Sequence, residues 1–288
     1  MKRFLLLPVT LALALAVLPA AGEPTDFIRF VEGEEGDSLQ TAVVSYESPQ
    51  KAKVDLVGAI HIADKAYFDG LNVRFKGYEA VLYELVGPSI EERNKPDAQK
   101  EPLQQKLQWV GQLQTMMRDT LKLHGQLEGI DYTARNFVHA DMDMSQFTQT
   151  QDQKQESFLT LYLKAVQAQK SINAERGVNS DAAGMVMLLK ILTMKDSSIE
   201  LKRLLAREFD SVEDIMAGVE SGDGTVLVGE RNRVALEVMD QQLAAGKKRM
   251  AIFYGAAHLA DMEERLLKKG FKRGKVEWLK AWNLPHEK

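Results

Sequence analysis

Alternating apolar and polar positions near the start of the chain predict β-strands. The runs LQTAVVSY and KVDLVGAI (53–60) are rich in β-branched residues, and the Ser-Pro pair between them favours a turn. The period then becomes helical, since Ala66, Leu71 and Phe75 recur near helical spacing before the apolar run AVLYELV (80–86). This order predicts a strand–helix–strand unit whose two strands form a parallel pair.

The middle of the chain has the apolar spacing of helices, and strand patterns return near the end. After KRMAIFYGAAH, the run DMEERLLKKG (261–270) predicts a short helix and KVEWLKAW (275–282) a last strand. The sequence therefore predicts an α/β fold with a central mixed, partly parallel sheet. A large helical insertion, about 102–225, would separate the two strand–helix units.

The first residues have the layout of a secretory signal peptide. Two basic residues precede an apolar run, and Ala20-Ala21-Gly22 offers a cleavage site. We expect residues 1–22 to be removed, and 23–288 to form one exported domain, periplasmic or extracellular. The apolar run is short for a membrane span and contains prolines, so an uncleaved anchor is the alternative. We expect no stable span in the mature chain.

Composition narrows the chemistry. The 288 residues include no cysteine, which excludes disulfides, thiolate metal ligands and a cysteine nucleophile. A metal site would therefore use His, Asp, Glu or water. The net charge is −4, and no basic stripe is interleaved with aromatic residues, so we expect no nucleic-acid partner.

One short motif occurs twice. The heptapeptides GAIHIAD and GAAHLAD agree at five of seven positions, and each follows an apolar strand. His61 and His258 would then lie at the carboxyl edge of one sheet, where ligands bind in open parallel sheets. Gly58 and Gly255 would let the backbone turn sharply or let a ligand come close. The alternative is a duplicated folding unit with packed, hydrogen-bonded histidines.

The repeated motif also carries an aspartate in each copy. Asp64 and Asp261 precede predicted helices, so we expect them to act as helix caps, with direct site chemistry as the alternative. Asp261 and Glu264 have the spacing of a capping box.

Glu84 is the only charged residue in the apolar run AVLYELV. Burying a carboxylate costs several kcal/mol unless a cation, a metal or several donors satisfy it. His61, Glu84 and His258 could therefore converge as a two-histidine, one-carboxylate set that suits Zn, Mn, Co or Fe(II). The alternative is an exposed glutamate on an edge strand.

Arg231 lies on the apolar side of a predicted helix. It shares a stripe with Val234 and Val238, whereas Arg233 falls on a charged, solvated face. Arg231 should face the core or the site and needs an anion: a substrate carboxylate, an oxyanion or Glu84. A structural ion pair is the alternative. Asn232 is a weaker candidate of the same kind.

The segment NFVHADM contains a His-x-Asp pair, His139 and Asp141. The pair could be a further ligand or a proton relay, although a lone histidine beside apolar residues is more often a satisfied core or capping residue. The chain contains no HExxH, GxSxG, GxGxxG or Walker motif.

The chain resembles the TraB/TIKI family (TraB/PrgY/GumN-like) in four features: the paired GxxH corners, the YEL glutamate, the ERN helix start and the NFVHAD segment. That family belongs to a wider group that includes erythromycin esterases and ChaN-like haem-binding proteins. The resemblance covers about residues 40–282. It implies an α/β fold with a helical insertion and a site built from His61, Glu84, Arg231 and His258. TIKI members are described as metal-dependent proteases, and TraB members as inhibitors of peptide pheromone signalling.

We therefore expect an exported metal-dependent hydrolase, a peptidase above all, acting on a peptide or small-molecule substrate. His61, Glu84 and His258 would hold Mn, Co or Zn, and Arg231 would stabilise the oxyanion. Glu84 would be either a ligand or the general base. The rivals are a protein that binds a peptide or haem without turnover, and a metal-independent esterase in which His61 or His258 is the base.

Overall fold

The computed structural model describes residues 26–93, 108–156, 198–209 and 225–286, with a few residues between 160 and 220. The predicted signal peptide lies outside the described residues. The strands are β1 (Ile28–Val31), β2 (Gly36–Glu47), β3 (Lys53–Ala59), β4 (Ile62–Ala63), β5 (Ala80–Tyr83), β6 (His124–Gly125), β7 (Phe137–His139), β8 (Arg249–Gly255) and β9 (Lys272–Pro285). The helices are α1 (Lys65–Phe75), α2 (Ile90–Arg93), α4 (Gln108–Leu121), α5 (Gln126–Gly129), α6 (Met144–Gln153), α9 (Ser198–Phe209), the π-helix η1 (Val226–Glu230), α11 (Arg231–Ala244) and α12 (Ala256–Lys268).

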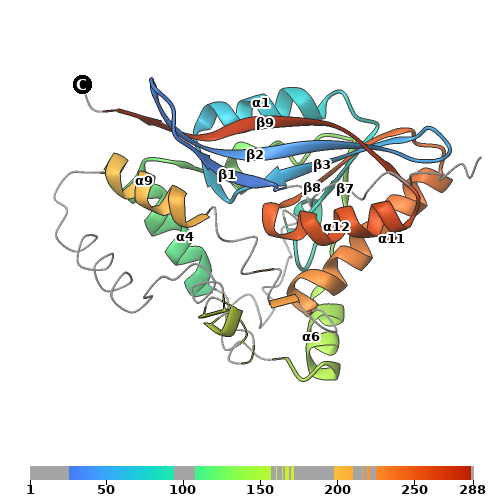
Figure 1. Ribbon diagram of the computed structural model, residues 1–288. Helices are drawn as coiled ribbons and strands as arrows, with labels where there is room; N and C mark the ends of the chain where they lie inside the picture. Colours follow the sequence, from blue (N-terminus) through green and yellow to red (C-terminus); the bar gives the residue numbers. More distant parts are fainter. Residues whose placement is uncertain are drawn as a thin grey trace, which may run out of the picture.

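A mixed seven-stranded sheet forms the centre of the fold (Figure 1). Its order is β1-β2-β3-β8-β5-β7, with β9 also paired to β2. Strands β3, β8, β5 and β7 are parallel, whereas β1, β2 and β9 pair antiparallel. The predicted α/β class with a mixed, partly parallel sheet is confirmed. The apolar runs of β5 and β8 fit central parallel strands, which are covered on both faces.

The predicted pairing of the first two parallel strands is wrong. Strand β8 lies between β3 and β5, since Phe253 is the register partner of both Val57 and Tyr83. A crossover helix fixes the relative direction of two strands but leaves room for a third strand between them. Strand β8, which comes more than 160 residues after β5, fills that position.

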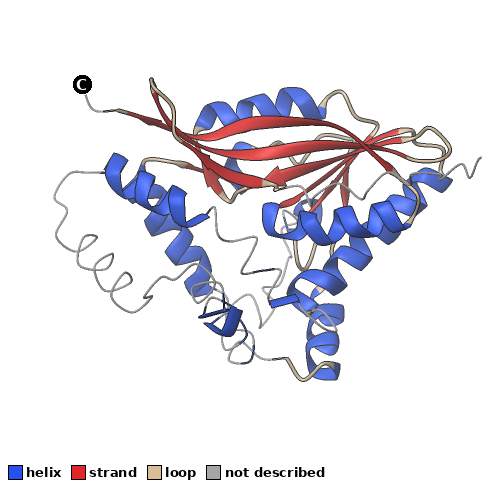
Figure 2. Ribbon diagram, in the orientation of Figure 1, coloured by secondary structure: helices blue, strands red, loops and turns tan. Residues whose placement is uncertain are grey.

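Helices cover both faces of the sheet (Figures 1 and 2). In Figure 1, α1 lies above the sheet, and α11 and α12 lie below it. The buried side of α12 includes Leu259, Met262 and Leu266. In the described ranges, the largest fully buried side chains include Trp282, Tyr46, Tyr254, Phe27, Phe68, Phe75 and Phe253.

The predicted helical insertion contains a strand of the central sheet. Helices α4, α5, α6 and α9 fall between about 102 and 225, but so does β7, which pairs with β5. The apolar run in β7 is only three residues long, so it gives no strand period that could be recognised. Much of the remaining predicted insertion lies outside the described residues.

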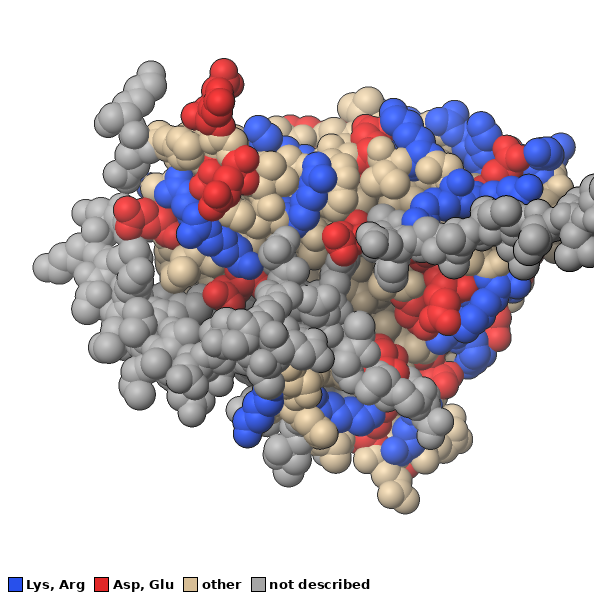
Figure 3. Space-filling view, in the orientation of Figure 1, with Lys and Arg blue, Asp and Glu red and all other residues tan. Residues whose placement is uncertain are grey.

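No helix in the described part of the chain is long and apolar enough to cross a membrane. On the face shown in Figure 3, acidic and basic side chains lie near one another over much of the described surface. Ion pairs at the surface include Lys268 with Glu264 and Lys269 with Asp240.

Candidate functional site

The four parallel strands end at one edge of the sheet, and a predicted site residue follows each of them. Ala59, at the end of β3, is the partner of Gly255, at the end of β8, and Tyr83 of β5 is the partner of His139. His61 follows β3, Glu84 follows β5, Asp141 follows β7 and His258 follows β8. The sheet therefore gathers residues that are far apart in the sequence.

Arg231, the first residue of α11, connects these strand ends. Its side chain is 9% exposed, whereas that of Arg233 is 50% exposed. Its Nε and Nη2 donate to the two Asp141 oxygens at 2.9 and 2.6 Å, and Nη2 also donates to Glu84 Oε1 at 2.6 Å. Nη1 donates to the Leu227 carbonyl at 3.2 Å and lies 3.4 Å from His258 Nε2. Arg231 thus donates four hydrogen bonds to carboxylate and carbonyl oxygens, and Nη1 also faces the His258 ring.

Glu84 lies directly after β5 rather than within a strand. Its Oε2 accepts from the Gly255 backbone N–H at 2.7 Å, and a Cβ at Gly255 would lie only 3.3 Å from that oxygen. Burial alone would raise the pKa of Glu84. The charge of Arg231, those that His258 and His61 carry when protonated, and the Gly255 N–H outweigh burial and hold this pKa well below its usual range.

His258 lies in the first turn of α12, not in a loop before it. It is 6% exposed; its Nδ1 lies 2.7 Å from Asn232 Oδ1, and its Nε2 lies 3.6 Å from Glu84 Oε1. Burial lowers the pKa of His258 to about 4, helped by the charge of Arg231 and opposed by that of Glu84. The ring is therefore neutral at pH 7.

Asn232 links His258 to Asp261. Its Nδ2 donates to the His258 carbonyl at 2.9 Å and to Asp261 Oδ2 at 2.7 Å, and Arg265 donates to the same oxygen. The predicted capping role of Asp261, and with it the capping box to Glu264, is wrong. Helix α12 already begins at Ala256, so Asp261 lies in its interior.

Asp64 is not a side-chain cap either. It occupies the N-cap position of α1, but its side chain makes no capping hydrogen bond. Instead, Oδ1 pairs with Lys202 of α9 at 2.7 Å, and Oδ2 accepts from the Asn283 backbone N–H at 2.6 Å. Two donors from other elements thus replace the helix N-terminus as its partners.

His61 differs from its counterpart in the repeat. It is exposed and lies in the short link between β3 and β4, and its carbonyl accepts from the Gln126 N–H at 2.8 Å. Within the described ranges, no hydrogen bond or ion pair joins the His61 ring to Glu84 or His258. Its charge is nevertheless close enough to influence the pKa values of both.

Two other predicted residues have backbone or packing contacts. His139 Nε2 lies 2.6 Å from the Leu85 carbonyl oxygen, and its ring packs against Tyr83. Gly58 lies inside β3 rather than at a corner, so its predicted turning role is wrong. A Cβ there would come within 3.2 Å of the Phe27 carbonyl oxygen, so close approach of backbone accounts for this glycine.

The sequence reasoning missed Tyr254. Its ring packs edge-on against the His258 ring, with 5.3 Å between the ring centres, and its hydroxyl donates to the Ala140 carbonyl. A tyrosine at the end of an apolar strand is typical of a core residue, so the sequence around Tyr254 does not indicate a role in the site.

Two of the predicted metal ligands, Glu84 and His258, both contact Arg231. Both Glu84 oxygens accept from Arg231 or Gly255, and Arg231 Nη1 faces His258 Nε2. The guanidinium thus fills the place that a cation bound by Glu84 and His258 would need, and two cations there would repel. In the described part of the chain, no cluster of three His, Asp or Glu residues is arranged to hold a metal ion.

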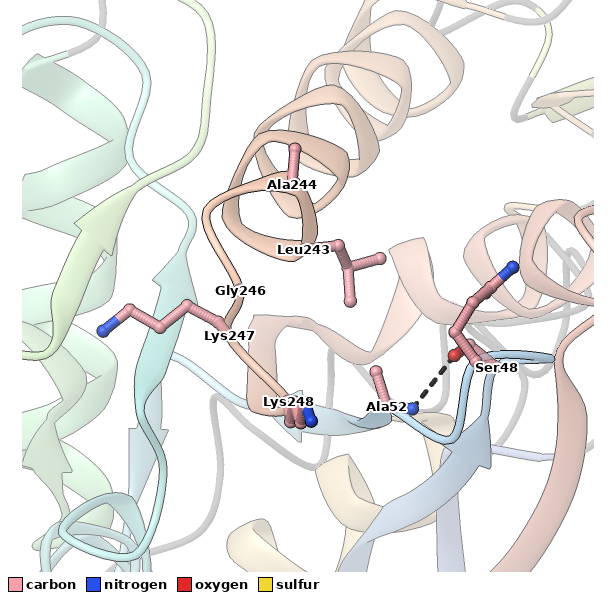
Figure 4. A pocket seen from close by; sticks show the side chains of 8 residues that line it. Ser48, Ala52, Leu243, Ala244, Gly246, Lys247 and Lys248 are labelled. Atoms are coloured by element: carbon pink, nitrogen blue, oxygen red, sulfur yellow. Dashed lines mark hydrogen bonds between the residues drawn. The ribbon is translucent and has the colours of Figure 1, made fainter.

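A separate pocket of about 320 Å³ lies at the opposite end of the sheet (Figure 4). Ser48 and Ala52, before β3, line one side, and Leu243, Ala244 and Lys248, before β8, line the other. The Ala52 N–H donates to the Ser48 hydroxyl. Strands β3 and β8 begin at this pocket and end near Arg231, Glu84 and His258, so the pocket is not part of the candidate site.

No family model matches the chain, and a search of curated proteins gives no significant match.

Proposed function

We propose that the protein is an exported hydrolase of peptide or ester bonds, with His258, Arg231 and Glu84 as its catalytic residues. The observation that carries the proposal is the burial of His258, Arg231 and Asp141 beside Glu84 at the carboxyl edge of the parallel strands. Ligands bind beyond this edge in open parallel sheets. A buried charge cluster is also often no more stable than apolar residues of similar volume, which favours a functional reason for it.

His258 would act as the general base. Its pKa of about 4 keeps the ring neutral at pH 7, so it can accept a proton from an attacking water. The imidazolium that forms would lie 3.6 Å from Glu84 Oε1, whose charge would stabilise it. His258 would then return the proton to the leaving amine or alcohol as the tetrahedral intermediate breaks down.

Arg231 would stabilise the oxyanion of that intermediate. Asp141 fixes the guanidinium with two parallel hydrogen bonds, so its direction is set before substrate binds. The longest contact, 3.4 Å from Nη1 to His258, is the one that a substrate oxygen would replace. Removing a donor of this kind costs about 3 kcal/mol of transition-state stabilisation.

The motifs shared with the TraB/TIKI proteins favour a peptide bond as the substrate. Export through the predicted signal peptide would place the reaction in the periplasm or outside the cell. Exposed His61 is the histidine of the pair that solvent reaches, so it would contact the substrate.

A metal-dependent peptidase is the second candidate. It is favoured by the position of His61 and His258, both close enough to Glu84 for their charges to lower its pKa. These three residues would hold Mn, Co or Zn once Arg231 had moved away from Glu84 and His258. With Arg231 in contact with both Glu84 and His258, the present arrangement of these residues does not fit a metal ion.

The deciding experiment incubates purified mature protein with a diverse peptide library and a panel of activated esters. Wild type is compared with Glu84→Gln and His258→Gln, after dialysis against a chelator and after return of Mn, Co or Zn. We expect cleavage that withstands the chelator and that His258→Gln slows by about 100-fold to 10,000-fold.

Exposed Arg233→Gln and His286→Gln serve as controls and should keep wild-type rates. Activity that the chelator abolishes and one metal restores would replace the first candidate with the second. Tight binding of a peptide or of haem without any cleavage would contradict both and identify a binding protein.

A further inference from the structure

We propose that Asp261 and Asn232 hold the His258 ring with its proton on Nδ1, leaving Nε2 as the only atom through which His258 takes a proton or a ligand. The inference deepens the proposed function and rests on it for its catalytic meaning. Its structural basis is a chain of two hydrogen bonds, from Asp261 to the Asn232 amide and from that amide to the His258 ring.

The neighbours of Asn232 determine the orientation of its amide group. Its Nδ2 lies 2.7 Å from Asp261 Oδ2 and 2.9 Å from the His258 carbonyl oxygen. A carboxylate and a carbonyl only accept hydrogen bonds, so the NH₂ group must face them. Arg265 donates to the same Asp261 oxygen at 2.7 Å, which keeps that oxygen an acceptor. The opposite orientation of the amide would set its oxygen against two acceptors.

The orientation of this amide in turn determines the tautomer of the His258 ring. Once the amide is oriented, Asn232 Oδ1 is an acceptor 2.7 Å from His258 Nδ1, so Nδ1 must carry the proton. The contact on the other side of the ring favours the same tautomer, because Arg231 Nη1 is a donor 3.4 Å from Nε2. Glu84 Oε1 would attract a proton on Nε2 from 3.6 Å, but this oxygen already accepts from Arg231 at 2.6 Å.

This tautomer couples the base to the oxyanion donor. While Nε2 is unprotonated, it faces Arg231 Nη1. When Nε2 takes the proton of the attacking water, it can no longer accept a hydrogen bond, so Nη1 is released as the oxyanion forms. Asn232 and Asp261 are thus positioning residues that act through His258.

The two histidines of the repeat are therefore unequal. Asp261 orients the partner of His258, whereas Asp64 pairs with Lys202 and Asn283. His61 is exposed and makes no ring hydrogen bond to Glu84 or His258 within the described ranges. Two similar heptapeptides thus give one buried histidine whose ring is hydrogen-bonded to Asn232 and one exposed histidine.

The test is the tautomer of His258, read from two-bond ¹H–¹⁵N correlations of ¹⁵N-labelled mature protein at neutral pH. The ring is assigned by comparison with His258→Gln. We expect one tautomer with the proton on Nδ1. A proton on Nε2 in the wild type, or a mixture of both forms, would overturn the inference without any further variant.

The variant Asn232→Leu tests whether Asn232 sets the tautomer of His258. We expect it to lose the single Nδ1–H form and to lower kcat by roughly 10-fold to 100-fold with little change in KM. Arg233→Gln, one position along α11, should change neither. If Asn232→Leu does not fold, Asp261→Ala makes the same test by releasing the amide.

An unchanged ring spectrum in a folded variant would show that Asn232 does not set the tautomer. The spectrum decides this inference even if no hydrolysis is found, in which case only the proposed function fails. Hydrolysis by a protein whose His258 carries its proton on Nε2 would leave the proposed function standing and this inference refuted.

Discussion

Arg231 is the residue on which the charge cluster depends. One guanidinium donates to both oxygens of Asp141 and to Glu84, and its Nη1 faces His258. The pKa of Arg231 lies above its ordinary value, because the carboxylates of Glu84 and Asp141 outweigh the opposing effect of burial. The fork geometry matters as much as the charge, since only a planar guanidinium can bind one carboxylate with two bonds and still reach a second.

Arg231→Lys should therefore be costly although it keeps the charge. An ammonium group cannot bind Asp141 bidentately, so the buried carboxylates lose donors. We expect the free energy of unfolding to fall by about 3 kcal/mol in urea denaturation. Arg233→Lys, an exposed change two residues along, should stay within about 0.5 kcal/mol of wild type. Equal losses in the two variants would refute the dependence on geometry.

Helix α9 stabilises the link that carries His61. Lys202 is 6% exposed, and its ammonium group pairs with Asp64 and lies 5.9 Å from the ring centre of Trp282 in β9. The Trp282 indole donates to the Ile62 carbonyl at 2.7 Å. One side chain of α9 therefore connects the segment after β3 to the last strand.

Lys202→Met should destabilise the protein more than a similar change on the open side of α9. It keeps the length of the side chain but leaves the partly buried Asp64 with one donor fewer, at a cost of about 2 kcal/mol. The control, Arg207→Met, removes an exposed pair with Glu32 and should cost no more than about 0.5 kcal/mol. Thermal unfolding of both variants measures the difference, and matching midpoints would contradict the anchoring role.

At the scale of the whole molecule, the sheet concentrates pH-sensitive groups at one edge. His258 has a folded pKa of about 4 against an ordinary value of 6.5, so between these values the unfolded chain binds a proton that the folded protein does not. The stabilisation is complete above pH 6.5 and is lost as the pH falls through about 4. Glu84 acts in the same direction below its ordinary value of 4.5.

We therefore expect the free energy of unfolding to fall on acidification from about pH 7 to about pH 4, with His258 contributing at most about 3 kcal/mol. Urea denaturation across this range measures the slope. His258→Gln should flatten it, whereas His124→Gln, at an exposed position, should leave it unchanged. A His258→Gln slope as steep as that of wild type would show that another group is responsible.

Periodicity predicted the elements and the direction of single side chains. The alternating runs gave β2 and β3, and the helical stripe separated buried Arg231 from exposed Arg233. Periodicity could not place β8 between β3 and β5, because local spacing carries no information about which distant strand pairs with which. It also missed β7, whose apolar run is too short to show a period.

The sequence by itself determined that two similar strand ends each carry a histidine, and that one arginine and one glutamate would need partners. Only the tertiary structure decided what those partners are. Two aspartates that local spacing predicted as caps pair with distant donors, Asp64 with Lys202 and Asp261 with Asn232. Similar heptapeptides diverge in this way because a partly buried carboxylate is satisfied by whichever donors the fold brings within hydrogen-bond distance, and Lys202 and Asn232 come from elements far away in the chain.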